Sequence, residues 1–165
     1  MKQFLFLIIV FSINTSFIRQ LKNSNAPEKQ FHSGFYLATI DTSKKLGLKL
    51  VNSEKYYLID STNYLSLRYV DTVFYTYNSN FKGYLLTIEF NNEGSKKLLE
   101  FTTKNEKQDV ALLVDNKLFF VANIFEPIYY GGIDLASNFD KTQMENIQFS
   151  MNKEIKDRQS MKKSK

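Results

Sequence analysis

The sequence predicts an α+β domain in which a mainly antiparallel sheet carries two helices packed on one face. From Gly34 onward, short segments rich in Tyr, Ile, Leu and Val alternate apolar and polar residues, which is typical of strands. Two later segments change to the three-to-four-residue spacing of an amphipathic helix. Hydrophobic residues form 43% of the 165, which is enough for the core of one domain.

The first half of this domain reads as strands separated by polar turns. The segment "STNYLSLRYVD" is ambiguous, because Ser66 or Asn63 can cap a single helical turn there. Around it, alternating patterns predict five strands. They span residues 35–40, 46–51, 55–60, 72–78 and 83–90.

Two helices are predicted from capping residues and apolar spacing. The first spans about Glu93 to Thr103, with Asn91 or Asn92 as its cap. The second begins after Asp140, which forms a capping box with Gln143. Its apolar face consists of Met144, Ile147 and Met151.

Between these helices, "VALLVDNKLFFVANI" predicts a β-hairpin of residues 110–114 and 118–121. Asp115 and Asn116 suit a two-residue type I′ turn, because both residue types tolerate positive φ.

The segment "NIFEPIYYGG" that follows the hairpin is interpreted as architecture. Pro127 lacks an N–H, so the strand must end or lie at a sheet edge there. Gly131 and Gly132 allow the chain to reverse toward the second helix. Glu126 is expected to contact backbone or a basic group, and not to act in catalysis.

The chain ends are predicted to lie outside the fold. Lys2 precedes an apolar run from Phe4 to Ile13, which predicts a signal peptide over residues 1–18, or an uncleaved anchor. This places the protein outside the cytoplasmic membrane, as a periplasmic, secreted or membrane-tethered chain. The remaining divisions are a linker at 19–33, the domain at 34–152 and a disordered basic tail at 153–165.

The charge distribution argues against nucleic acid as a ligand. The net charge is +5, yet the tail contributes +4 and the first 19 residues +2. The body between them holds 14 basic and 15 acidic residues, whereas a nucleic-acid binder needs positive charge on its folded surface. The basic tail is interpreted as solvated, with attraction to an anionic membrane surface as the alternative.

Residues for familiar catalytic chemistry are scarce. The chain has no cysteine, and its single histidine, His32, falls in the linker. No phosphate-binding glycine motif is present, and no spacing brings two carboxylates together. We therefore predict no catalytic, metal or cofactor site and a non-enzymatic protein. A small hydrolase with an unrecognised carboxylate site stays as a remote alternative.

The chain is rich in aromatic residues, with 10 Tyr and 15 Phe. Tyrosine suits a half-buried strand surface, and this explanation is sufficient for most of them. The alternative is an exposed aromatic face that binds extended polypeptide or glycan. The candidates for such a face are Tyr75, Tyr77, Tyr129 and Tyr130.

Together, "EFNNEGSKKLLEFTTKN", "VALLVDNKLFFVANIFEPIYYGG" and "NFDKTQME" resemble the head subdomain of the first periplasmic domain of SecD, from the SecDF protein-export factor. The resemblance covers about Tyr56 to Met151. It implies structural roles for a set of matching positions. These include Gly94, Asp115, Asn116, Glu126, Pro127, Ile128, Gly131, Gly132 and Phe139.

The sequence also departs from the family pattern. Asn116 replaces the turn glycine, Asn123 replaces a proline, and "MENIQF" replaces the alanines of the last helix. The base subdomain and transmembrane helices of SecD have no counterpart. The resemblance implies a non-enzymatic extracytoplasmic module that binds polypeptide. The alternative is a structural or regulatory docking subunit of an envelope complex unrelated to export.

Overall fold

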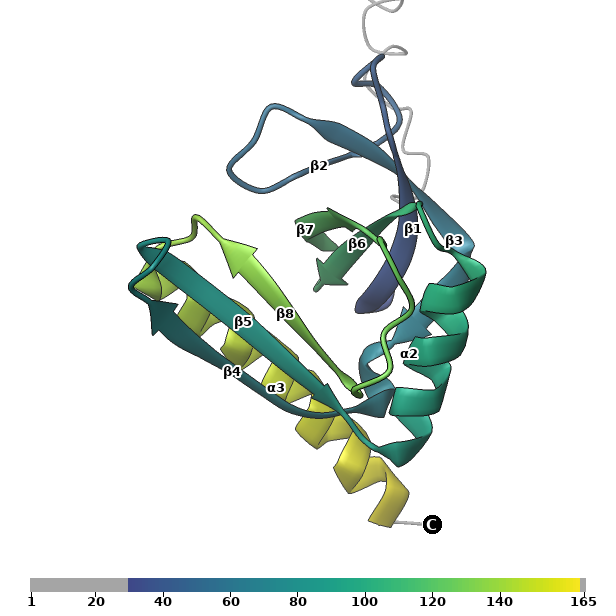
Figure 1. Ribbon diagram of the computed structural model, residues 1–165, viewed down its shortest axis with the longest axis vertical. Coiled ribbons are helices and arrows are strands. Elements are labelled where there is room, and N and C mark those ends of the chain that lie inside the picture. Colours follow the sequence, from purple (N-terminus) through teal and green to yellow (C-terminus); the bar gives the residue numbers. More distant parts are fainter. Residues whose placement is uncertain (1–29, 164–165) are drawn as a thin grey trace, which may run out of the picture.

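The computed structural model describes the backbone of residues 30–163 and the side chains to residue 157, and this part of the chain forms two antiparallel sheets (Figure 1). One sheet has the strand order β2-β3-β1-β6-β7 and the other β4-β5-β8. The α+β class is confirmed, with two sheets where the sequence predicted one. The strands are β1 (Gly34–Ile40), β2 (Leu48–Lys49), β3 (Tyr56–Ser66), β4 (Val70–Asn78), β5 (Gly83–Phe90), β6 (Asp109–Val114), β7 (Lys117–Asn123) and β8 (Gly132–Ser137).

Three helical elements accompany the sheets: η1 (Leu67–Tyr69), α2 (Asn92–Lys104) and α3 (Lys141–Lys163). Ser66 caps η1, which resolves the ambiguity at this turn. Asn91 caps α2 by accepting the backbone N–H of Gly94. At α3 the predicted capping box is present, since Asp140 and Gln143 each accept the other's backbone N–H.

Helix α3 continues past Asn152, so the prediction of a disordered tail from Lys153 is wrong for residues 153–163. Met151 and Ile155 are both buried in the main core. Met151 was part of the predicted apolar face, and Ile155 extends that face by one more turn. Element η1 is one of those that α3 contacts. This burial stabilises the helix beyond its expected end.

Strand β3 is longer than predicted because a polar bulge lies within it. Its pairing with β1 shifts between Tyr36 and Leu37, so "STN" after Asp60 bulges out of the ladder. The carboxylate of Asp60 accepts the backbone N–H and the hydroxyl of Thr62, at 2.8 and 2.7 Å. Ser61 to Asn63, which the sequence pattern placed beyond the end of a strand, therefore lie inside β3.

The β6–β7 turn has the predicted conformation, with φ of 48° at Asp115 and 62° at Asn116. It is tied to the segment before β1. Phe31 donates its N–H to Asn116 Oδ1 at 3.0 Å, and Asp115 donates its N–H to Ser33 Oγ at 3.1 Å. Phe31 also packs edge-on against Tyr36. Residues 31–33 therefore belong to the domain and not to a linker, whereas residues 1–29 lie outside the described part.

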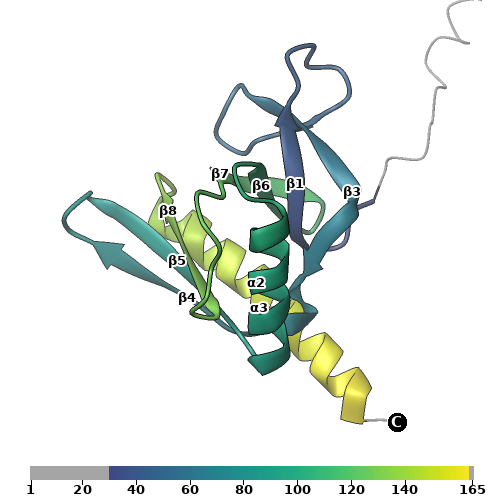
Figure 2. The ribbon, with the colours of Figure 1, turned by 45° about the vertical axis from the view of Figure 1, so that its right-hand side comes forward.

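The main core lies between the two sheets and the helices. Leu86 and Ile88 of β5, Leu112 of β6 and Met144 of α3 are among its fully buried side chains. Figure 2 shows α3 running along the three-stranded sheet and α2 beside the lower part of the five-stranded sheet. The opposite face of the five-stranded sheet carries a smaller apolar cluster. Its buried members are Tyr36, Ala38, Tyr57, Ala111, Leu113 and Leu118.

The five-stranded sheet curls until its two ends meet. Leu50, just after β2, forms a parallel bridge with Leu118 of β7, and Val51 donates its N–H to the Leu118 carbonyl at 2.9 Å. This contact covers the first part of β7 and leaves its second part as a free edge. Among the described helices, none combines the length and apolar character needed to span a bilayer.

Candidate functional site

An apolar cleft of about 300 Å³ lies where the free ends of the two sheets face each other. Its walls are Ala122 to Ile124 of the β7 end, Ile133 to Leu135 of β8, and the side of α2 that carries Leu98, Phe101 and Thr102. A further hollow of about 220 Å³ continues between the same two strands, bordered by Phe119 to Val121 and by Ala136 to Phe139. The two hollows follow the edges of β7 and β8.

The ladder of β8 shows which of its peptide groups point into this region. Phe90 donates its N–H to the Gly131 carbonyl at 2.8 Å, and the register pairs Ile133 with Ile88. Because bonded and non-bonded pairs alternate in an antiparallel ladder, Ile133 and Leu135 bond to β5. The peptide groups of Asp134 and Ala136 therefore point to the free edge.

The same reasoning applies to β7. Ile124 donates its N–H to the Gln108 carbonyl at 2.9 Å and accepts the Lys107 N–H at 2.7 Å, so it belongs to a bonded pair with the β6 side. By alternation, the peptide groups of Val121 and Asn123 point away from β6. Two rows of edge peptide groups thus border the hollows, one on each sheet.

The loop of residues 124–131 forms one wall of the cleft and runs beside α2 in both ribbon views (Figures 1 and 2). Ile128 donates its N–H to Thr102 Oγ1 at 3.0 Å, and the buried Thr102 hydroxyl donates to the Leu98 carbonyl at 2.8 Å. Gly131 has a φ of +67°, and a Cβ there would lie 2.4 Å from Ser95 Oγ. These contacts fix the loop, and Gly131 leads into β8 where the sequence predicted a reversal toward the second helix.

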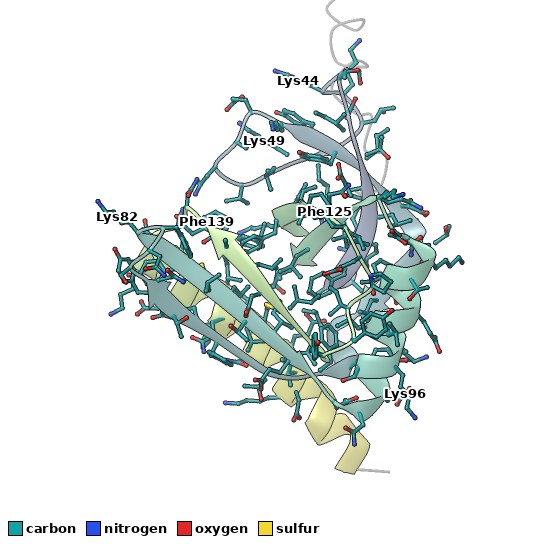
Figure 3. The ribbon with its side chains drawn as sticks, viewed as in Figure 1. Lys44, Lys49, Lys82, Lys96, Phe125 and Phe139 are labelled. Atoms are coloured by element: carbon teal, nitrogen blue, oxygen red, sulfur yellow. The ribbon has the colours of Figure 1, made fainter. Side chains whose placement is uncertain are left out.

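The loop exposes three aromatic side chains. Phe125 is 82% exposed and borders the cleft, while Tyr129 and Tyr130 are 69% and 98% exposed further along. Phe125 lies before β8, and Phe139 lies beyond its other end, packed edge-on against Phe119 and Phe120 (Figure 3). Aromatic rings therefore flank both ends of the β7–β8 edges.

The four candidate tyrosines do not form one face. Tyr75 and Tyr77 lie on β4, at the far edge of the three-stranded sheet from β8. Tyr75 is half-buried, donates its hydroxyl to Glu145 of α3 at 3.1 Å and packs edge-on against Tyr84. Burial raises the pKa of Tyr75, and the bond to Glu145 adds to the rise. Tyr129 and Tyr130 alone lie near the cleft.

The remaining family-matching positions act in packing and turns. A Cβ on Gly94 would lie 2.6 Å from the Tyr69 carbonyl, so α2 approaches η1 closely only because no side chain intervenes there. Ile128 is half-buried and packs on the main core, and Pro127 lies in the loop after β7 has ended. Glu126 borders the cleft mouth and is exposed. The expected contact of Glu126 with a basic group is absent among the described ion pairs.

Sequence reasoning missed Thr102 and β8. Thr102 carries no signal beyond its place on the buried face of a helix, and its partner Ile128 is 26 residues away. Apolar and polar residues alternate in "GIDLAS", but the glycine pair at its start was interpreted as a turn, so β8 was not predicted. Within residues 30–157, no three His, Asp or Glu side chains are grouped as metal ligands. The site offers apolar contact and backbone hydrogen bonding.

Comparison with known proteins identifies the family of this fold. The family described as "SecDF, P1 head subdomain" matches residues 43–154. The protein translocase subunit SecD of Acidaminococcus fermentans is 29% identical over 63 residues, which cover 38% of this chain and 15% of that protein. The chain thus spans a small part of this relative.

Two solved structures share the fold. The crystal structure of SecDF in its super-membrane-facing form aligns with a TM-score of 0.54 and 14% identity, over 72% of this chain and 18% of that one. A structure of SecDF, described as a membrane component that enhances protein export, aligns with a TM-score of 0.55 and 14% identity. That alignment covers 73% of this chain and 62% of the other.

Proposed function

Since the chain belongs to the SecDF P1 head subdomain family, we propose that it is a non-enzymatic extracytoplasmic module that binds extended polypeptide along the free edge of β8. A role in handling exported chains follows from the same family and forms part of the proposal. The observation that carries it is the apolar cleft between two unpaired strand edges.

Strand addition suits the chemistry of this cleft. The outward peptide groups of Asp134 and Ala136 offer two donors and two acceptors to an incoming strand. Main-chain hydrogen bonds of this kind give affinity without dependence on sequence, which fits a module that meets many different chains. The side chain of Ala136 is small, and the cleft next to it accepts apolar side chains.

The exposed loop aromatics fit the same function. Phe125 borders the cleft, and Tyr129 and Tyr130 extend the aromatic surface along the loop. Aromatic side chains bury large areas at little cost in conformational entropy, and tyrosine adds a hydroxyl for hydrogen bonding. A chain paired with β8 would therefore also gain side-chain contacts at the mouth of the cleft.

The test is a proline placed on the binding edge. In Ala136→Pro the lost N–H is one that β5 does not use, so the sheet is expected to remain folded. We expect a fluorescein-labelled peptide of alternating valine and threonine to bind this variant about tenfold more weakly, the equivalent of one or two hydrogen bonds. The matched control Ala136→Ser keeps the N–H and should bind as the natural chain does. Equal binding by both variants would overturn strand addition at β8.

A second candidate function is a docking subunit for one envelope protein, which the nearly fully exposed Tyr130 favours. The variant Tyr129→Ser/Tyr130→Ser separates the two. If it retains peptide binding but loses a single stoichiometric partner after crosslinking in envelopes, docking is the function of the loop. If the variant and the natural chain both recover translocase components or many exported chains, polypeptide handling stands.

A further inference from the structure

A third hollow, of about 370 Å³, lies on a neighbouring face of α2, where that helix meets the end of β3 and η1. It shares Phe101 with the apolar cleft and otherwise has different walls. Its lining carries Arg68 of η1 and Lys97 and Lys104 of α2. Glu100 is the acidic residue of the lining, so the hollow has a net charge of +2. We call it the cationic pocket.

Among the residues that the structure describes, no carboxylate lies at ion-pair distance from the three cations, and Glu93 acts on Arg68 only at longer range. Within the described part of the chain, the ion pairs are Lys49 with Glu54 and Lys141 with Glu145, and neither involves the pocket. Glu100 lies on the same helix face as Lys97 and Lys104, three and four residues away, and still pairs with neither at ion-pair distance. The positive charge is therefore available to a ligand.

Aromatic residues hold the pocket in shape. The guanidinium carbon of Arg68 lies 4.4 Å from the centre of the buried Tyr69 ring, and Arg68 also donates a hydrogen bond to the Tyr69 hydroxyl. Lys97 Nζ lies 5.3 Å from the same ring centre. Two of the three cations thus have a defined place before any ligand arrives.

We propose that the cationic pocket binds the carboxylate side chains of an acidic peptide segment. Arginine presents paired N–H groups that match a carboxylate, and the two lysines of α2 add point charges. Phe101, which also lines the pocket, offers apolar contact to the methylene groups of glutamate. A lipid surface presents its charges in one plane, whereas these cations surround a hollow. This favours a side chain that projects into it.

This inference goes beyond the proposed function, because strand addition at β8 needs no charge. The two activities can be measured separately. Ala136→Pro removes the β8 edge donor and should leave acidic-peptide binding unchanged. Loss of cationic-pocket binding should in turn leave the valine–threonine peptide bound.

The experiment uses the full chain and a fluorescein-labelled peptide in which pairs of glutamates alternate with glycines, read by anisotropy at an ionic strength of about 0.15 M. We expect Lys97→Gln/Lys104→Gln to weaken binding about tenfold. The matched control is Lys82→Gln/Lys117→Gln, which removes the same charge from the β4–β5 turn and from the start of β7, neither of which lines the pocket. That control should change the affinity less than about twofold, because distant charges are screened. Arg68→Lys should also weaken binding, since the paired donors are lost.

Three results would overturn the proposal. The first is unchanged affinity in the pocket double variant. The second is equal weakening in the control double variant, which would show a response to net charge alone. The third is binding of phosphatidylglycerol vesicles that depends on Lys97 and Lys104 while the glutamate peptide fails to bind. That outcome would assign the pocket to lipid headgroups instead.

Discussion

The backbone N–H of Ile128 lies 3.0 Å from Thr102 Oγ1, and this hydrogen bond joins the loop that walls the cleft to helix α2. Thr102 is buried, and its hydroxyl donates a hydrogen bond to the Leu98 carbonyl. One hydroxyl thereby serves as acceptor for the loop and donor to the helix.

Replacing Thr102 by valine keeps its volume and removes the acceptor. The Ile128 N–H then loses its partner, and we expect Thr102→Val to lower the free energy of unfolding by about 1–2 kcal/mol. The amide of Ile128 should also exchange faster with solvent. Thr103→Val, at the exposed neighbouring position, is the control and should change neither quantity. Equal effects of the two variants in chemical denaturation would contradict this role for Thr102.

The two adjacent glycines differ sharply in what they tolerate. Gly131 has φ +67° and a Cβ there would meet Ser95 Oγ, whereas a Cβ on Gly132 would be 3.4 Å from the Ile88 carbonyl. Gly131→Ala should destabilise the domain by about 1–3 kcal/mol, and Gly132→Ala by clearly less. The melting temperature of each variant checks this order. Adding Ser95→Gly should recover only the steric part of the loss at Gly131.

Asn116 replaces a turn glycine and adds a contact that glycine lacks. Its side chain accepts the Phe31 N–H while its φ of 62° remains one that asparagine tolerates. Asn116→Ala loses both advantages, so we expect a cost of about 1–2 kcal/mol. Asn116→Gly loses only the side-chain bond and should cost less. Urea denaturation of both variants tests the order, and an equal cost would mean that the contact with Phe31 adds nothing.

The buried Asp41 predicts a pH dependence of stability. The Ser43 hydroxyl, 2.5 Å away, is the main cause that holds the pKa of this carboxyl far below its ordinary value. Burial opposes this lowering, and the N–H groups of Leu46, Gly47 and Ser43 add to it. A lowered folded-state pKa stabilises the fold above the unfolded value, which is about 4. This stabilisation is lost as the pH falls below that value.

Asp41→Asn should therefore destabilise the domain at pH 7, and the difference from the natural chain should shrink at pH 3. Urea denaturation at both values measures it. Asp71→Asn, which removes an equivalent charge from an exposed strand position, is the control. A difference between Asp41→Asn and the natural chain that is the same at both pH values would argue against ionisation as its cause.

Local patterns predicted the local structure well. Residues 83–90 form a strand with the expected bounds, and α2 exceeds its predicted range by one residue at each end. Ser66, Asn91 and Asp140 cap the elements assigned to them, because capping depends on residues two or three positions apart.

Long-range pairing could not be predicted in this way. Period-two alternation shows which face of a strand is buried, but it does not show which strand lies beside it. The sequence therefore held no signal for the division of the strands into two sheets. Gly132, which was predicted to be part of a chain reversal, pairs with Glu89 and is the first residue of β8. Since the cleft exists only between β7 and β8, its lining was hidden for the same reason. The sequence predicted a structural role for the loop of Pro127 and Gly131, and its place as a wall of the cleft became visible only in the fold.

The most direct test of polypeptide binding is amide hydrogen exchange of the full chain with and without the valine–threonine peptide. Strand addition at β8 predicts that the amides of Asp134 and Ala136, which face the free edge, become protected when the peptide binds. The amides of Ile133 and Leu135 already bond to β5 and should change little. Binding without added protection at Asp134 and Ala136 would contradict the account.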